Sequence, residues 1–135
     1  MLLYSCEYDK EDNKDSKDNT VSKADRLYKE LTGIYKIVKS QLTYTDQTKL
    51  ILEPPDINGT MTITSSRKIT QKLTVYNKTV EVKGTYEINP DEGIMLVNNE
   101  PSNVKSSMAY TWDGEILTTT VILQTLTEKD FWRQQ

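Results

Sequence analysis

The sequence predicts an all-β fold: an eight-stranded antiparallel up-and-down barrel with a short N-terminal helix. From residue 33 onward, apolar and polar residues alternate with a period of two, which is typical of half-buried strands. The alternating segments are short, tight-turn sequences separate them, and no helical pattern interrupts them. Closing such a meander into a barrel removes its exposed edges. A two-sheet sandwich of the same strands is the alternative.

A short helix is expected before the first strand. Ser22 is an N-cap residue with Asp25 three positions later, a variant of the capping box. Apolar residues follow at helical spacing, namely Ala24, Leu27, Tyr28 and Leu31. Gly33 should end a helix of about ten residues. A helix this short is marginal alone, so we expect it to dock on the barrel and cover one end.

The strands are expected in sequence along the rest of the chain. The first starts at Gly33 and bends near Lys39, and residues 49–52 form a short run before two prolines. Residues 56–59 are predicted to turn, because Asn58-Gly59 is a strong turn sequence. Gly84, on an inward face, marks a bend or a close approach. The other predicted strands are 60–64, 68–76, 79–88, 94–97, 104–112, 117–123 and 125–133.

Composition argues against several functional classes. The net charge is -3, and residues 7–19 hold six acidic residues against three lysines, so the remainder is neutral. A neutral body with an acidic tail argues against nucleic acid and against a polybasic membrane patch. With no histidine and one cysteine, the usual metal sites and catalytic triads lack their residues. The carboxyl pair Glu128 and Asp130 is expected on a wet strand face. We therefore expect a protein that is not an enzyme, with no cofactor and no metal.

Leu3-Tyr4-Ser5-Cys6 resembles the lipobox that ends a bacterial lipoprotein signal peptide. The resemblance implies a lipid anchor on Cys6 and a place in the bacterial cell envelope. Within the envelope, the outer membrane and exposure at the cell surface are the finer expectation. The charged and longer apolar regions of a signal peptide are missing before it, which fits a truncated start. An incidental cysteine is the alternative. Residues 1–20 are then a lipoprotein-type N-terminus with a disordered acidic tether, and 21–135 the barrel domain.

Three features of the chain together indicate a family, namely Gly33-Ile34-Tyr35 after a short helix, the series of strands that follows, and Arg133 in the last strand. In these features the chain resembles the calycins, meaning lipocalins and their relatives. It is most similar to the lipocalin-like domains of Bacteroidetes lipoproteins. Lipocalins open the first strand with Gly-x-Trp, and an arginine near the end of the barrel packs over that ring. The resemblance implies that Gly33, Tyr35 and Arg133 close the barrel, with Tyr35 at the tryptophan position. Residues 84–86 and 110–118 also resemble later strands of the family.

Alternation places one set of residues inside the barrel, where a ligand would bind. The set comprises Met61, Ile63, Gln71, Leu73, Val82, Tyr86, Ser106, Met108, Tyr110, Leu117 and Thr119. A filled core and an apolar pocket with a few polar groups both fit it, and the short strands favour a small or closed cavity.

Two functions follow from these alternatives. The first is a cell-envelope lipoprotein whose barrel binds a small hydrophobic ligand or acts as a recognition module. The second is a protein-binding barrel, such as a protease-inhibitor-like module, with a packed interior and a protein partner.

Overall fold

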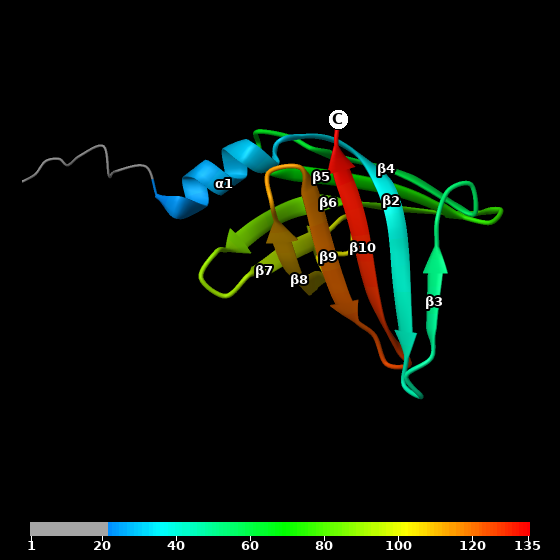
Figure 1. The fold of residues 1–135 in the computed structure, drawn as a ribbon. Coiled ribbons are helices and arrows are strands. Elements are labelled where there is room, and N and C mark those ends of the chain that lie inside the picture. Colours follow the sequence, from blue (N-terminus) through cyan, green and yellow to red (C-terminus); the bar gives the residue numbers. More distant parts are fainter. Residues whose placement is uncertain (1–21) are drawn as a thin grey trace, which may run out of the picture.

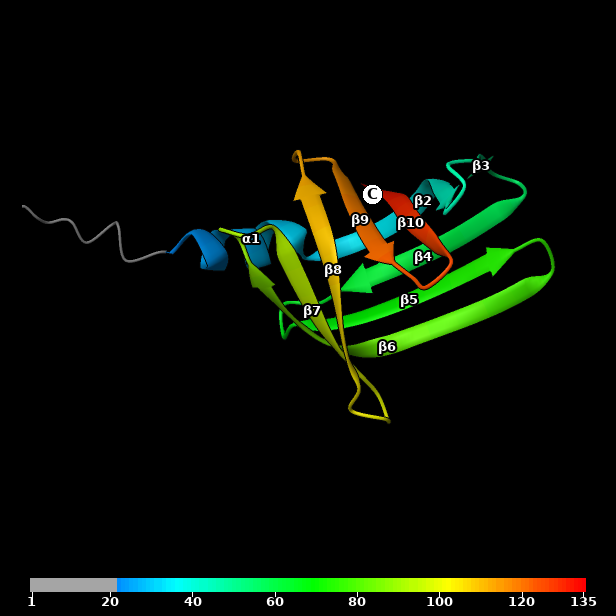
Figure 2. The same cartoon turned by 90° about the horizontal axis from the view of Figure 1, so that it is seen from below.

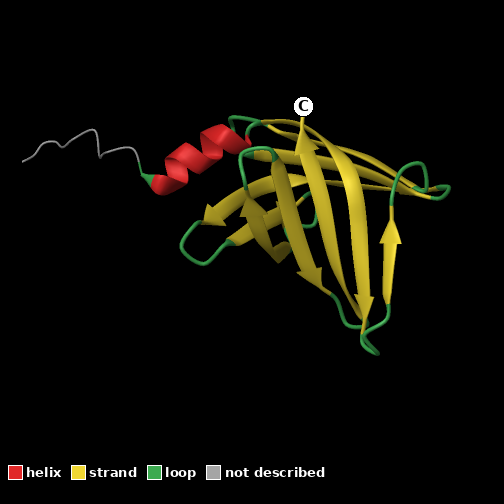
Figure 3. Ribbon diagram, viewed as in Figure 1, coloured by secondary structure: helices red, strands yellow, loops and turns green. Residues whose placement is uncertain are grey.

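Strands make up most of the described part of the chain. The computed structural model describes residues 22–135, with one helix at one end of the strands (Figures 1 and 3). The helix is α1 (Lys23–Leu31). The strands are β2 (Gly33–Tyr44), β3 (Lys49–Leu52), β4 (Ile57–Ile63), β5 (Lys68–Val75), β6 (Lys78–Asn89), β7 (Ile94–Asn99), β8 (Lys105–Trp112), β9 (Ile116–Ile122) and β10 (Leu126–Gln134). Within residues 22–135, no helix has the length and apolar character needed to cross a membrane.

Pairing between β10 and β2 closes the sheet into a barrel. The order is β10-β9-β8-β7-β6-β5-β4-β2, all antiparallel, and β10 pairs with β2 from Leu126↔Tyr44 to Gln134↔Tyr35. Strand β3 pairs only with the second half of β2, whose first half pairs with β4. Figure 2 shows β10 and β2 on one side of the molecule and β5 and β6 on the other. The predicted eight-stranded antiparallel barrel is confirmed, and the sandwich is excluded.

A β-bulge in β2 changes which of its residues face inward. Phe131 pairs with Lys39 and Trp132 pairs with Ile37, so Val38 has no partner on β10. An extra residue reverses the side to which all later side chains point. Tyr35 and Ile37 are therefore buried before the bulge, and Ser40 is buried after it. The bend predicted near Lys39 is confirmed.

Helix α1 docks at one end of the barrel through an aromatic contact. Its N-cap is as predicted, because the Ser22 hydroxyl accepts a hydrogen bond from the Asp25 amide at 3.0 Å. The ring of Tyr28 lies 5.5 Å from that of Tyr86, and its hydroxyl accepts a hydrogen bond from the amide of Ile88 at 2.9 Å. At the end of the helix, Leu31 is fully buried. The helix thus covers this end of the barrel (Figure 1).

Tyr35 and Gln134 join the first and last strands of the barrel at the end next to α1. Tyr35 is fully buried, and its hydroxyl donates a hydrogen bond to the carbonyl of Leu31 at 2.6 Å. The amide of Gln134 donates to the Tyr35 hydroxyl at 3.2 Å and also to the carbonyls of Glu30 and Thr32. Burial raises the pKa of Tyr35 above its usual value, so the hydroxyl remains a donor.

Arg133 does not contribute to this closure, and the prediction that it packs over Tyr35 is wrong. Its side chain is exposed and pairs with Glu115, with 3.1 Å between Nε and the carboxylate oxygen. Trp132 is fully buried, so its neighbour Arg133 must face outward and Gln134 inward. Gly33 belongs to the closure as predicted, because a Cβ there would lie 3.0 Å from the Gln134 amide nitrogen.

Two inward glycines allow close packing in the barrel wall. Asn58 and Gly59 lie within β4, paired with Thr74 and Leu73, so the turn predicted there is wrong. A Cβ on Gly59 would lie 2.7 Å from Leu73 and 3.3 Å from the indole of Trp132, so glycine makes room for the buried ring. At Gly84 a Cβ would collide with the carbonyl oxygen of Asn98 on β7, which confirms the predicted close approach.

Candidate functional site

The half of the barrel next to α1 is filled with side chains. Tyr35, at the start of β2, is paired with Met61 near the end of β4, and both are fully buried. The ring of Tyr35 meets that of Trp112 edge-on, with 6.3 Å between centroids. The other buried residues of this packed half are Ile63, Tyr86, Met95, Tyr110, Leu117 and Trp132. Neither of the two interior spaces described next is lined by these side chains.

The other half of the barrel is hollow, and we call this space the interior cavity. A larger compartment of about 360 Å³ lies against β2 to β6 and β10, and a smaller one of about 220 Å³ lies against β5 to β10. Gln71, Val82 and Glu128 line both compartments, so the two adjoin. Exposed side chains such as Val80 and Leu123 also line them, so the cavity reaches the end of the barrel away from α1.

The structure divides the predicted interior residues between the two halves. Six of them line the interior cavity, namely Gln71, Leu73, Val82, Ser106, Met108 and Thr119. The other five, Met61, Ile63, Tyr86, Tyr110 and Leu117, lie in the packed half and line no part of the cavity. Alternation specifies which face of a strand a residue occupies, but not its height along the barrel axis. The register between the strands decides that height.

Three buried polar residues lie side by side in the wall of the barrel. Asp130 on β10 pairs with Ser40 on β2 and with Thr119 on β9, and we call these three residues the polar row. Their exposed fractions are 2% for Ser40, 5% for Asp130 and 6% for Thr119. Glu128 lies two residues along β10 on the same face and lines both compartments. The cavity therefore has one acidic, hydrogen-bonding wall.

The prediction that Glu128 and Asp130 lie on a wet strand face is wrong for Asp130, which is buried. An inward Arg133 would place Glu128 and Asp130 on the outer face, because side chains alternate along a strand. Trp132 gives the correct phase, because tryptophan is buried far more often than arginine. Counting back by two from Trp132 gives Asp130 and then Glu128 as inward residues.

The carboxyl group of Asp130 has an unusual environment. One of its oxygens, Oδ1, is buried and has no hydrogen-bond partner. Burial raises the pKa of Asp130 to about 8; a hydrogen bond and the like charge of Glu128 add to this rise, and a hydrogen bond with Ser40 opposes it. Among the described residues, no lysine or arginine lines either compartment. Lys39, on the neighbouring strand, instead lies over the ring of Phe131 at 4.8 Å.

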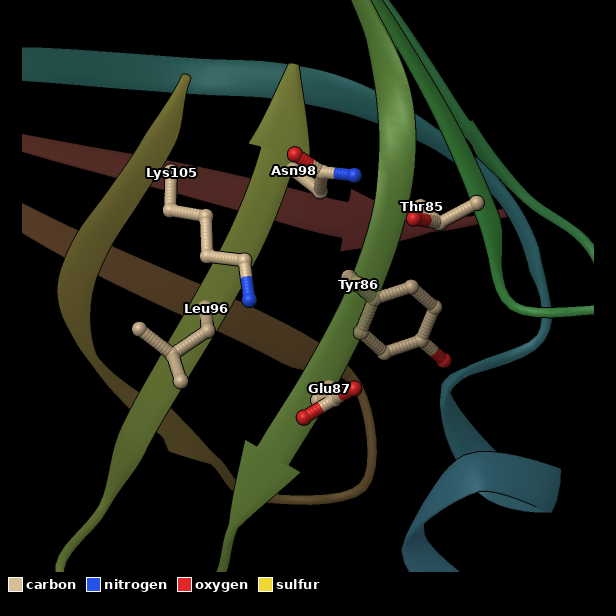
Figure 4. A pocket seen from close by; sticks show the side chains of 6 residues that line it. All are labelled: Thr85, Tyr86, Glu87, Leu96, Asn98 and Lys105. Atoms are coloured by element: carbon tan, nitrogen blue, oxygen red, sulfur yellow. The ribbon is translucent and has the colours of Figure 1, made fainter. Parts of the chain in front are cut away.

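Two other hollows are less suited to holding a ligand. One, of about 100 Å³, is lined by residues of β6, β7 and β8; Figure 4 shows Leu96 and Lys105 on one side of the β6 ribbon and Tyr86 on the other. The second lies between α1 and residues 64–67 and is lined mostly by exposed polar or charged side chains. Within residues 22–135, no group of three or more His, Cys, Asp or Glu side chains is arranged to hold a metal ion.

Cys6 and the predicted tether lie outside the described residues, so the structure gives no information on lipidation. No protein-family model matches this chain, and no curated protein matches it either. The interior cavity and the polar row are therefore the observations on which a functional proposal can rest.

Proposed function

We propose that this protein is a non-enzymatic, lipocalin-like binding barrel that holds a small hydrophobic ligand in its interior cavity. The observation that carries the proposal is the hollow half of the barrel. Its larger compartment, of about 360 Å³, falls within the range of about 300–1,000 Å³ that is common for ligand pockets. The alternative of a protein-binding barrel needs a packed interior, and only the half next to α1 is packed.

The lining of the cavity supports an apolar ligand. Leu42, Leu73, Val75 and Val82 provide an aliphatic wall on β2, β5 and β6. Met108 and Val121 continue it in the smaller compartment, where Ser106 adds a hydroxyl group near the open end. Apolar walls with a few convergent polar groups are the usual composition of small-molecule sites.

A probe-binding experiment with a matched pair of variants tests this proposal. The neutral fluorescent probe N-phenyl-1-naphthylamine is expected to bind the wild-type protein with a rise in emission. Val82→Trp fills space shared by both compartments and should weaken binding by about tenfold or more, a loss of about 1.4 kcal/mol. Lys83→Trp adds the same ring to the outer face of β6, where the side chain is exposed, and should leave binding unchanged.

Probe binding that is equally weakened by both variants, or absent from the wild-type protein, would contradict a binding role for the cavity. Native mass spectrometry of protein purified gently from its host provides an independent measurement. It should detect a small molecule bound to the wild-type barrel and lost from Val82→Trp.

The proposal includes a place in the bacterial cell envelope, anchored to the membrane through lipid on Cys6. Its support is the Leu3-Tyr4-Ser5-Cys6 sequence followed by an acidic segment. Mass spectrometry of the protein extracted from its host should find acyl chains on the peptide that contains Cys6. Full-length protein without lipid, recovered from the cytoplasm, would contradict this part and leave the ligand-binding proposal standing.

A further inference from the structure

The polar row lies in the wall of the interior cavity, and no lysine or arginine of the described chain lines the cavity to balance its carboxyl group. Ser40, Asp130 and Thr119 are the buried polar or charged residues of the described chain, and they occupy neighbouring positions on three strands. A scattered distribution would suggest individual structural roles. A single cluster that lines a cavity, with Glu128 on the same face, indicates a binding site for a polar group of a ligand.

The carboxyl group of Asp130 has no cationic partner among the described residues that line its compartment. Glu128 faces it from its own strand, and the neighbours on β2 and β9 are the uncharged Ser40 and Thr119. Gln71 and Met108 line the same compartment from β5 and β8, and neither titrates. A buried carboxyl group without a counter-charge is costly, and here the Oδ1 atom is left without any partner as well.

These features discriminate between ligand head groups. A carboxylate or phosphate would meet the negative charge of Glu128, and that of Asp130 once Asp130 ionises, with no lysine or arginine within residues 22–135 lining the cavity to balance either, so like charges would repel it. A hydroxyl group could donate one hydrogen bond but would bring no charge. A primary ammonium group carries a positive charge and three N–H donors, enough to reach Asp130, Glu128 and a neighbouring hydroxyl, and charge-assisted hydrogen bonds are the stronger kind.

We propose that the interior cavity selects hydrophobic ligands that carry a primary ammonium group, with Asp130 and Glu128 binding the ammonium and the aliphatic wall holding the apolar chain. This inference rests on the proposed function and specifies its ligand class. The ammonium lies beside the polar row, and the chain extends past Val82 toward the open end.

Isothermal titration calorimetry with three ligands of equal chain length tests the inference. Octylamine, 1-octanol and octanoate are titrated at about pH 9, where Asp130 is ionised, into the wild-type protein, Asp130→Asn, Glu128→Gln and the control Asp91→Asn. Asp91 is a highly exposed carboxylate outside the cavity. Octylamine is expected to bind the wild-type protein at least about tenfold more tightly than octanol, and octanoate most weakly.

Each cavity variant should bring octylamine to within about threefold of octanol without weakening octanol, because only the charge-assisted contact is removed. Asp91→Asn should keep the wild-type order. The inference is overturned if octanol or octanoate binds as tightly as octylamine, or if both cavity variants keep the preference for the amine. In either case the cavity still binds hydrophobic ligands and the proposed function stands. If no ligand binds and the naphthylamine probe also fails, the proposed function falls with it.

Discussion

Asp130→Asn is expected to make the protein more stable than the wild type in alkaline solution and nearly equal to it in acid. Asparagine has almost the shape of a protonated aspartic acid, and it never ionises. In the wild-type protein, burial raises the pKa of Asp130 from 3.8 to about 8, with Glu128 adding to the rise. The folded protein therefore keeps this proton over a pH range in which the unfolded chain has lost it.

The sign of the pH dependence follows from proton linkage. Between about pH 4 and pH 8 the folded state binds one more proton than the unfolded state, so raising the pH favours unfolding. The stabilisation is complete below the unfolded pKa and is lost as the pH rises through the folded pKa. The free energy of unfolding should fall by up to about 1.4 kcal/mol per pH unit in this window. The total loss in the free energy of unfolding across this window is expected to be roughly 2–5 kcal/mol. It falls below the full product of slope and pH range because Asp130 titrates together with Glu128 and because the structure relaxes around the new charge.

Urea denaturation at a series of pH values measures this effect. The difference in unfolding free energy between Asp130→Asn and the wild type should grow from near zero at about pH 4 to a plateau above about pH 8. Asp91→Asn changes an exposed carboxylate and should follow the wild-type curve. A constant difference between Asp130→Asn and the wild type at all pH values would show that Asp130 does not titrate as the structure implies.

Tyr35→Ala is expected to be the most destabilising single change considered in the packed half of the barrel. It removes a fully buried ring and leaves a cavity, a loss of about 3–5 kcal/mol for a large aromatic residue. It also removes the hydroxyl between the Leu31 carbonyl and the Gln134 amide. Tyr35→Phe keeps the ring and should cost about 1–3 kcal/mol, because the carbonyl loses its partner.

Chemical denaturation of these variants, with Tyr76→Ala as the control, measures the two contributions. Tyr76 is an exposed tyrosine in the turn between β5 and β6, so its replacement should change stability by less than about 0.5 kcal/mol. Tyr35→Phe should still bind N-phenyl-1-naphthylamine, because Tyr35 does not line the interior cavity. A Tyr35→Ala variant as stable as Tyr76→Ala would show that the Tyr35 contacts do not hold α1, β2 and β10 together.

Of the three residues predicted to close the barrel, Gly33 and Tyr35 take part in the closure and Arg133 does not. Gly33 and Tyr35 lie at the start of β2, and both contact Gln134 in place of the predicted Arg133. Arg133 and Gln134 are adjacent, so an error of one residue in the phase of β10 exchanges an outward side chain for an inward one. The register of Gln134 against Tyr35 joins strands about a hundred positions apart in the chain, and no local pattern specifies it.

The sequence by itself determined the fold class, the helix cap and most of the strands, because alternation, capping residues and turns act over a few neighbouring positions. Only the tertiary structure decided which half of the barrel is packed and which is hollow. It also decided which residues stand beside Asp130, since the bulge at Val38 and the register of β10 bring Ser40, Asp130 and Thr119 into one row. These outcomes depend on contacts between distant strands and on the position of α1, where the strand pattern carries no information.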